Sequence, residues 1–280
     1  MNILIIAILT LVLIGALSAI ILFFVSKKFV VFEDPRIVEV EAALPAANCG
    51  GCGFPGCHGF AVACVEAESL DHLVCTVGGL NTQKKVAHIL GKRSDSFVPT
   101  VAVVRCGGSC ELRPRKVQYD GVSSCLIAHN LYGGDTGCSW GCLGLGDCEV
   151  SCKFDAIHIN PETLLPEVDD EKCTSCNACV KACPKVIIEL RKKGLKSRRI
   201  YVNCVNKDKE ETIQDSCSVA CIGCGKCVAE CAYDAITLTG NLAFIDSAKC
   251  TLCRKCVSVC PTQAIVEVNF PKRRTPNLRQ

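Results

Sequence analysis

The stretch Cys173-Thr-Ser-Cys176-Asn-Ala-Cys179-Val-Lys-Ala-Cys183 decides how this chain folds, and its spacing C-x₂-C-x₂-C-x₃-C returns at residues 221–231 and 250–260. This spacing is typical of cysteines that bind [4Fe–4S] clusters. In paired clusters, the first three cysteines hold one cluster and the fourth binds its neighbour. The motif therefore predicts clusters in pairs, close enough together to form a path for electrons.

Cysteine usage allows two other interpretations. The chain has 26 cysteines in 280 residues, which a disulfide framework or a set of zinc sites could also use. Cysteines two or three residues apart are poorly placed for disulfides within one turn, and nothing resembles a cleaved signal peptide. Zinc sites usually combine two C-x₂-C pairs across a longer loop. A zinc-stabilised interaction protein thus remains the weaker alternative to iron–sulfur binding.

The hydrophobic cores are expected to be small, because the chain has one Met, one Trp and 5% aromatic residues. Metal binding then supplies folding free energy, and the apo chain should be largely unfolded beyond its anchor. The formal charge of +3 counts cysteines as neutral. Each four-thiolate cluster adds roughly two negative charges, so the loaded protein should be acidic.

The apolar stretch Ile3–Val25 predicts a single transmembrane helix, the anchor at residues 1–26. At about 1.5 Å per residue it covers the roughly 30 Å of hydrocarbon in a bilayer. Lys27 and Lys28 follow it directly and place the cysteine-rich body in the cytoplasm, where thiols stay reduced. One helix without charge cannot form an ion path, so any ion pumping belongs to partner subunits.

The first cysteine motif, C-x₂-C-x₄-C-x₁₇-C, predicts a one-cluster domain at residues 33–92. Its ligands would be Cys49, Cys52, Cys57 and Cys75. Cys64 is better explained as a small buried core residue. The same segment contains Gly51-x-Gly53-x-x-Gly56, but no strand precedes it and no ribose-binding acid follows, so we reject a dinucleotide site. No Walker loop is present either, and the sequence predicts no nicotinamide or nucleotide binding on this chain.

The frame C-x-x-x-A-I repeats along the carboxy-terminal half and predicts two ferredoxin-like modules, at residues 138–190 and 217–270. Exchange of the fourth cysteines predicts four ligand sets. These sets are Cys138, Cys142, Cys148 with Cys183; Cys173, Cys176, Cys179 with Cys152; Cys221, Cys224, Cys227 with Cys260; and Cys250, Cys253, Cys256 with Cys231. The first set has irregular spacing, C-x₃-C-x₅-C-x₃-C, and its ligands are less secure.

Two insertions, residues 93–137 and 191–216, hold most of the remaining cysteines. A sixth cluster could use Cys106, Cys110, Cys125 and one of Cys204 or Cys217. Spare buried thiols are the alternative. Both modules carry the same spacing C-x₁₂-C-x₃-C ahead of their motif, which favours a shared role. The sequence therefore predicts five [4Fe–4S] clusters, with a sixth in the middle region.

The basic segments carry weaker signals. The run Arg191–Arg199 is most simply a solvated hairpin tip, and residues 271–280 form a basic tail. Docking of an acidic redox protein is the functional alternative. Nucleic acid binding is not expected, because stacking aromatic residues are not interleaved with these charges. Trp140, between two cysteines, is expected to shield a cluster from water.

The single span, the Asn48–Cys57 motif with Cys75, and the tandem modules closely resemble the B subunit of the Rnf complex, a membrane-bound ferredoxin:NAD⁺ oxidoreductase. Segments Tyr132–Asp135 and Gly141–Cys148 resemble the extended form found in this family. The resemblance implies a translocase that couples electron flow from reduced ferredoxin to Na⁺ or H⁺ transport by integral-membrane subunits. It also implies that NAD and flavin belong to other subunits, and that this chain has no substrate-converting site.

The resulting expectation is an α+β, multi-cluster electron relay in the cytoplasmic membrane, working by one-electron hops. The one-cluster domain is flanked by Pro35, Pro45 and the segment Arg93–Pro99, so it could move as a carrier. The Cys49–Cys75 motif also resembles domains of corrinoid-linked methyl-transfer systems. That alternative needs a barrel and a cobamide pocket, for which the chain has no room.

Overall fold

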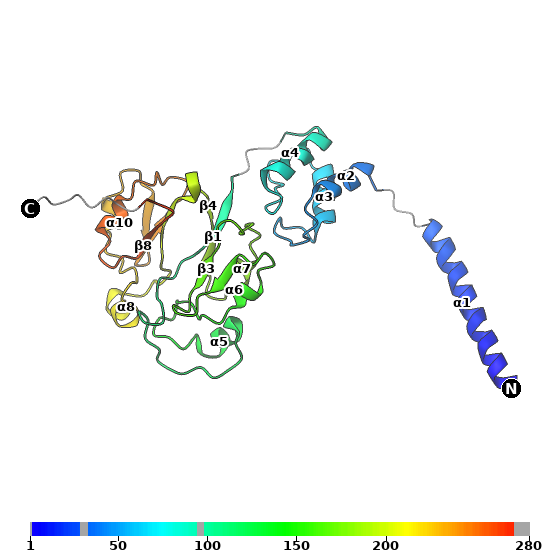
Figure 1. Cartoon of the computed structure of the whole chain (residues 1–280), viewed down its shortest axis with the longest axis horizontal. Helices are drawn as coiled ribbons and strands as arrows, with labels where there is room; N and C mark the ends of the chain where they lie inside the picture. The colour runs from blue at the N-terminus through cyan, green and yellow to red at the C-terminus, as the bar shows by residue number, and fades with distance from the viewer. Residues whose placement is uncertain (1, 29–32, 94–97, 272–280) are drawn as a thin grey trace, which may run out of the picture.

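The computed structural model describes residues 2–28, 33–93 and 98–271. The predicted tail therefore lies outside the described residues apart from Pro271, as do residue 1 of the anchor and most of the segment 93–99. Helix α1 (Asn2–Lys28) stands apart from the rest of the described chain (Figure 1). Within the described residues, Ile5–Lys28 is the one helix long and apolar enough to cross a membrane. The expected anchor is thus a helix of the required length.

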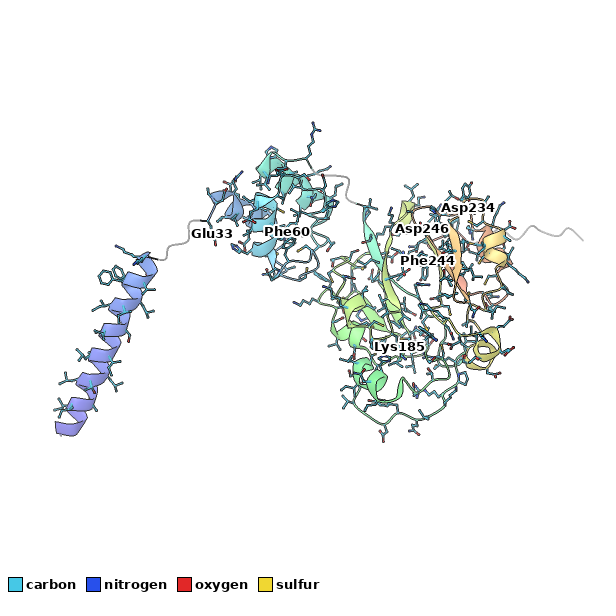
Figure 2. The ribbon with its side chains drawn as sticks, turned by 180° about the vertical axis from the view of Figure 1, so that it is seen from behind. Glu33, Phe60, Lys185, Asp234, Phe244 and Asp246 are labelled. Carbon is cyan, nitrogen blue, oxygen red and sulfur yellow. The ribbon has the colours of Figure 1, made fainter. Side chains whose placement is uncertain are left out.

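Three helices form the amino-terminal domain: α2 (Pro35–Ala43), α3 (Cys57–Glu66) and α4 (Gly79–Leu90). Asp34 caps α2 by accepting from the Arg36 amide, and Pro35 occupies the first helical turn, where its missing N–H costs nothing. Helix α4 ends at Gly91, which has the left-handed conformation common at helix ends. Phe60, labelled in Figure 2, packs at the centre of this domain with Cys64.

The remainder of the described chain contains four two-stranded antiparallel sheets and short helices, which confirms the α+β class. The strand pairs are β1 (Thr100–Val104) with β4 (Ile188–Lys192), β2 (Ile157–Ile159) with β3 (Pro166–Val168), β5 (Arg199–Val202) with β8 (Ile265–Val268), and β6 (Ile236–Thr239) with β7 (Leu242–Ile245). The helices are α5 (Cys125–Tyr132), α6 (Asp147–Val150), α7 (Ala178–Ala182), the 3₁₀ turn η1 (Leu195–Ser197), α8 (Glu210–Ser216), α9 (Lys226–Ala229) and α10 (Lys255–Val259).

The strands of the two modules extend into the segments that the sequence assigned to insertions. Strand β1 pairs with β4 in the register Val101↔Arg191, and β5 pairs with β8 in the register Tyr201↔Val266. Each module thus begins one strand earlier than its cysteine motif. The motif spacing does not reveal this, because strand pairing depends on contacts between segments far apart in the sequence.

The basic run spans the end of β4, η1 and the start of β5, and its two ends are not solvated as the sequence favoured, whereas Lys192, Leu195 and Lys196 are exposed. Arg191 is 4% exposed and Arg199 is 7% exposed. The Arg191 guanidinium forms an ion pair with Glu189, donates to the Ile245 carbonyl at 2.8 Å and stacks over Phe244 with its carbon 5.1 Å from the ring centre. Phe244, labelled in Figure 2, belongs to the second module, so this arginine joins the two modules.

Candidate iron–sulfur sites

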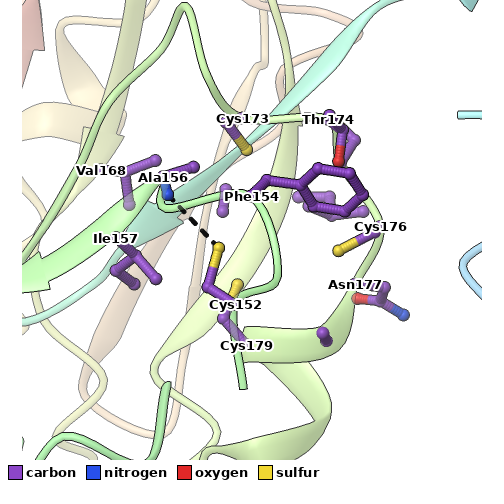
Figure 3. A pocket seen from close by; sticks show the side chains of 14 residues that line it. Cys152, Phe154, Ala156, Ile157, Val168, Cys173, Thr174, Cys176, Asn177 and Cys179 are labelled. Carbon is purple, nitrogen blue, oxygen red and sulfur yellow. Dashed lines mark hydrogen bonds between the residues drawn. The ribbon is translucent and has the colours of Figure 1, made fainter. Parts of the chain in front are cut away.

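Three hollows are each lined by four cysteines, in the groups that the sequence predicts. Each is open to solvent and has an empty volume of about 320–350 Å³, open solvent included. The groups are Cys49, Cys52, Cys57 and Cys75; Cys152, Cys173, Cys176 and Cys179; and Cys221, Cys224, Cys227 and Cys260. Figure 3 shows the second hollow, with its thiols gathered around the space and the Ala156 amide donating to Cys152 Sγ at 3.4 Å.

A fourth predicted group surrounds Cys256. The pKa of its thiol is raised to about 12, first by burial and then by the neighbouring thiols of Cys250, Cys253, Cys227 and Cys231. Three of these are the predicted partners. Cys227 belongs to the adjacent hollow, so two groups of the second module lie side by side.

Backbone conformation directs the thiols of each C-x₂-C-x₂-C loop inward. The middle cysteine is flanked on both sides by residues with positive φ: Ser175 and Asn177 around Cys176, Gly223 and Gly225 around Cys224, and Leu252 and Arg254 around Cys253. Such conformations turn successive amide groups toward one side and form concave, anion-binding backbone. The sequence indicates this only at the two glycines; for leucine and arginine, the left-handed conformation is imposed by the fold.

The fifth group differs from the set that the sequence predicts. Cys142, Cys148 and Cys183 line a hollow of about 350 Å³, as expected, but the fourth cysteine is Cys125 rather than Cys138. Asp147 explains the change: its carboxylate accepts from the Leu126 amide at 3.0 Å and from the Ser124 hydroxyl at 3.1 Å. These bonds hold the start of α5, where Cys125 lies, beside Cys148.

Cys138 instead joins the sixth group, which we call the middle site. Its four cysteines line a hollow of about 310 Å³ and are Cys106, Cys138, Cys204 and Cys217. The set that the sequence predicts for a sixth cluster shares Cys106 with this group, together with one of Cys204 or Cys217. The structure includes both of the latter, and it leaves Cys110 and Cys125 outside.

Hydrogen bonds and burial define the electrostatics of the middle site. Burial raises the pKa of the Cys204 thiol to about 12, while hydrogen bonds from the Cys221 and Asn206 backbones lower it. Asn206 is 1% exposed, and its Nδ2 also donates to Cys138 Sγ at 3.5 Å. Burial likewise raises the pKa of Cys138, and the Arg113 charge lowers it. Sequence reasoning missed both Arg113 and Asn206, because neither lies in a cysteine motif.

Two hydrogen bonds, from Trp140 to Asp208 and from Asp208 to Asn206, hold the side chains at the edge of the middle site. Trp140 lines the hollow, as expected for a residue that shields it, and donates from Nε1 to Asp208 Oδ1 at 3.0 Å. The Asp208 amide in turn donates to Asn206 Oδ1 at 2.7 Å. The side chains that surround the thiols are therefore held by bonds to one another.

Two cysteines lie outside all six groups. Cys64 is fully buried in the amino-terminal core, and burial raises the pKa of its thiol to about 12. Cys110 donates from Sγ to the Glu162 carbonyl at 3.0 Å. Cys64 is thus placed as the sequence predicts, whereas Cys110 is not with its predicted partners.

The donor sets fit iron–sulfur clusters. Five of the six groups bring four thiols to one hollow. Amide N–H groups are directed at sulfur from Gly78 to Cys75 at 3.3 Å and from Asn206 to Cys204 at 3.4 Å. Amide-to-sulfur bonds are a standard means of stabilising such clusters. Among the described residues, no group of three or more histidine, cysteine or acidic side chains is arranged to hold a single metal ion.

Comparison with known families supports this chemistry along most of the body. Residues 137–187 and 220–264 match a 4Fe-4S dicluster domain family, residues 165–232 match a second family of the same description, and residues 44–72 match an Fe-S cluster family. Fold, thiol groups and family matches together define a protein with multiple iron–sulfur clusters in ferredoxin-type modules.

Three curated relatives define the family more narrowly. The chain is 44% identical over 225 residues to the B subunit of the Na⁺-translocating ferredoxin:NAD⁺ oxidoreductase complex of Acetobacterium woodii, covering 80% of this chain and 66% of that protein. It is 39% identical over 250 residues to the B subunit of the proton-translocating complex of Clostridium ljungdahlii, with 89% and 87% covered. It is 38% identical over 251 residues to the B subunit of the ion-translocating oxidoreductase complex of Methanosarcina acetivorans, with 90% and 93% covered.

The chain therefore belongs to the B-subunit family of Rnf-type, ion-translocating ferredoxin:NAD⁺ oxidoreductase complexes. It spans just under two thirds of the length of the Acetobacterium relative and nearly all of the other two. The resemblance seen first in the motif spacing is confirmed.

Proposed function

We propose that this chain is a membrane-anchored relay that takes electrons from reduced ferredoxin and passes them to other subunits of its complex. Six four-cysteine groups would each hold one [4Fe–4S] cluster, and when bound, each cluster supplies a group that accepts and releases single electrons. The positions of the cysteines along this chain set the order of the groups. The surrounding residues shield the groups from water, and backbone amides donate hydrogen bonds to their sulfurs.

The observation that carries the proposal is that successive groups of the described chain lie beside one another. In the first module, the Cys179 thiol lies close enough to Cys148 to raise the pKa of the Cys148 thiol. The Cys142 amide then donates to Cys106 Sγ of the middle site at 3.5 Å. On the other side of the middle site, the Cys221 backbone hydrogen-bonds to the Cys204 thiol.

The series continues to both ends of the chain. In the second module, Cys227 and Cys256 bring its two groups together. At the other end, Gly51 of the amino-terminal domain lies against Cys176 of the first module. The middle site therefore joins two pairs of groups, and the amino-terminal group extends the series toward the anchor.

Exposure supports the second module as the entrance. Cys224 and Cys253 are exposed, whereas the other cysteines are buried or partly buried. Lys226 and Lys249 are exposed close to them in the sequence and give this end a positive rim, while Lys255 pairs with Glu230 at 3.8 Å. Such a rim suits an acidic redox partner such as ferredoxin, because opposite charges speed the encounter.

The anchor and the membrane partners complete the proposal. Helix α1 would cross the cytoplasmic membrane once, with Lys27 and Lys28 on the cytoplasmic side, next to the amino-terminal group. Residues 5–25 of α1 carry no charge, so transport of Na⁺ or H⁺ would belong to integral-membrane subunits, and NAD and flavin chemistry to others.

Anaerobic purification of the chain, followed by measurement of iron, acid-labile sulfide and zinc, tests the proposal. Six clusters require about 24 irons per chain with equal sulfide. About 20 would remove the middle site from the relay. Zinc in place of iron and sulfide would overturn electron transfer in favour of a zinc-stabilised interaction protein.

A further inference from the structure

One arginine of the middle site differs from the other buried arginines. Arg113 is 3% exposed, and its Nη1 donates to the Cys142 carbonyl, while its Nε has no hydrogen-bond partner within the described residues. By contrast, Arg105 pairs with Glu189 at 3.2 Å and Arg199 pairs with Asp170 at 2.6 Å. The partner recorded for Arg113 is a neutral carbonyl, so its positive charge is not balanced by a carboxylate there.

Two glycines make room for this side chain among the thiols. A Cβ built on Gly141 would lie 2.6 Å from Arg113 Nη1 and 3.5 Å from Cys138 Cβ. A Cβ built on Gly108 would lie 3.1 Å from Cys217 Sγ and 3.6 Å from Arg113 Cδ. The guanidinium stem therefore passes between two cysteines of the middle site, at positions where larger residues would displace it.

We propose that Arg113 raises the reduction potential of the middle site, so that the junction of the two modules holds an arriving electron more favourably than it would without this charge. The inference rests on the proposed function, namely that this site holds a [4Fe–4S] cluster. Reduction adds one electron from a neighbouring group and neither forms nor breaks a bond. The added negative charge is stabilised by a fixed positive charge, which acts strongly because both are buried.

The chemistry of the side chain suits this role. A guanidinium stays protonated at all physiological pH values, so its effect persists in both redox states. The hydrogen bonds from Asn206 to Cys138 and Cys204 act in the same direction, since amide groups directed at sulfur also favour the reduced cluster. Arg113 acts on the middle site through its positive charge alone, and it binds neither iron nor substrate.

Replacement of Arg113 by glutamine tests the proposal in the anaerobically purified chain. Spectroscopic redox titration should show the step of the middle site displaced to lower potential, with a smaller displacement for the group that contains Cys142, whose carbonyl accepts from Arg113, and with the remaining steps unchanged. At a fixed potential, the ratio of reduced to oxidised cluster in that step should fall about tenfold, which corresponds to about 59 mV. Arg113→Lys, which keeps the charge, should restore most of the shift.

Two further variants provide the controls. Arg115→Gln removes a charge from a side chain that is 53% exposed and should leave every step in place. Gly141→Ala keeps all charges but displaces the guanidinium, so the same step should move in the same direction by a smaller amount. If Arg113→Gln loses its middle-site iron, the lysine and Gly141→Ala variants still decide the question.

An Arg113→Gln chain with full iron and unchanged steps would overturn the proposed role of Arg113 while leaving the six-cluster relay intact. An unsubstituted chain with about 20 irons would instead overturn the middle cluster itself, by the four-iron composition of each site. The two failures are therefore distinguished by iron content measured before any titration.

Discussion

Gly51 of the amino-terminal domain lies directly against Cys176 of the first ferredoxin module. A Cβ built on Gly51 would be 2.8 Å from Cys176 Cα and 2.9 Å from its carbonyl oxygen. Gly51 and Cys176 each adjoin a four-cysteine hollow: Cys52 lines the first, and Cys176 lines the second. The absence of a side chain at residue 51 thus allows the two hollows to approach each other.

Gly51→Ala is expected to separate these two hollows and slow electron transfer between them. The backbone at Gly51 does not have positive φ, so alanine adds no local strain and acts through Cys176. Rapid-mixing reduction kinetics of the holoprotein should show slower filling of the amino-terminal cluster at unchanged iron content. Gly59→Ala, whose Cβ meets only Pro55 and Phe54 of the same domain, is the matched control. Equal rates in Gly51→Ala and the unsubstituted chain would argue against this contact as an electron path.

Cys125 and Cys110 separate the structural grouping from the sequence-based one. Cys125→Ala should remove about four irons, because Cys125 lines the hollow with Cys148 and Cys183. Cys110→Ala should retain them all, since its thiol contacts the Glu162 carbonyl outside the hollows. Iron and sulfide measurements on both variants check this. Loss of iron from Cys110→Ala alone would restore the sequence-based set for the sixth cluster.

Cys64 is expected to serve packing rather than metal binding. Its thiol is fully buried in the amino-terminal core and does not line the hollow formed by Cys49, Cys52, Cys57 and Cys75. Cys64→Ala should keep full iron and lower stability by about 1 kcal/mol through lost packing. Cys57→Ala, about two turns earlier on α3, should lose the amino-terminal cluster. Iron loss of equal size in both variants would show that Cys64 is a ligand.

Lys92 is expected to hold the end of helix α3. Its Nζ donates to the carbonyls of Cys64 and Val65, each at 2.8 Å, and to that of Ala67. These are carbonyl groups at the end of a helix, where a cation is favoured. Lys92→Met should destabilise the amino-terminal domain by about 1.5–3 kcal/mol, seen as faster loss of its cluster absorbance in denaturant. Lys85→Met on the exposed side of α4 should have little effect.

Arg191 is expected to stabilise the junction of the two modules. It contacts Glu189 and the Ile245 carbonyl, and it stacks over both Phe244 and Tyr201. Arg191→Met removes these contacts, while Glu189 keeps its ion pair with Arg105 at 3.2 Å, and the substitution should cost about 1.5–3 kcal/mol. The midpoint of guanidinium-induced bleaching should fall accordingly. Lys192→Met removes an exposed charge from the next residue of β4 and serves as the comparison; similar midpoints for the two variants would contradict a structural role for Arg191.

The local parts of this fold could be predicted from the sequence. The intact motifs at residues 173–183, 221–231 and 250–260 contain their own turns. In the first two motifs, the first three cysteines line one hollow, as the spacing predicts. Cys125 could not be assigned in this way, because Asp147 brings it into position from across a loop. Spacing describes neighbours along the chain, and the bond between Asp147 and the start of α5 is a tertiary contact.

The same distinction explains the strands and the buried arginines. Arg191 and Arg199 read as part of a solvated basic run, yet their partners Glu189, Ile245 and Asp170 lie on other segments or on the same strand two residues away. Arg113 carries no motif at all, and its position among the thiols follows from the two glycines that flank its path. The charge of these arginines predicted that they would lie on the surface, but their contacts with other segments bury them.

The middle site also has a mechanical consequence. Two of its cysteines, Cys106 and Cys138, precede the cysteine motifs of the first module. The other two, Cys204 and Cys217, lie between the motifs of the first module and those of the second. A cluster bound there would act as a four-way cross-link between segments far apart in the chain, much as a disulfide restricts the unfolded chain. Oxidative loss of that one cluster would remove the cross-link between the two modules and also interrupt electron transfer between them. The stability of the module junction and electron transfer would therefore be lost together.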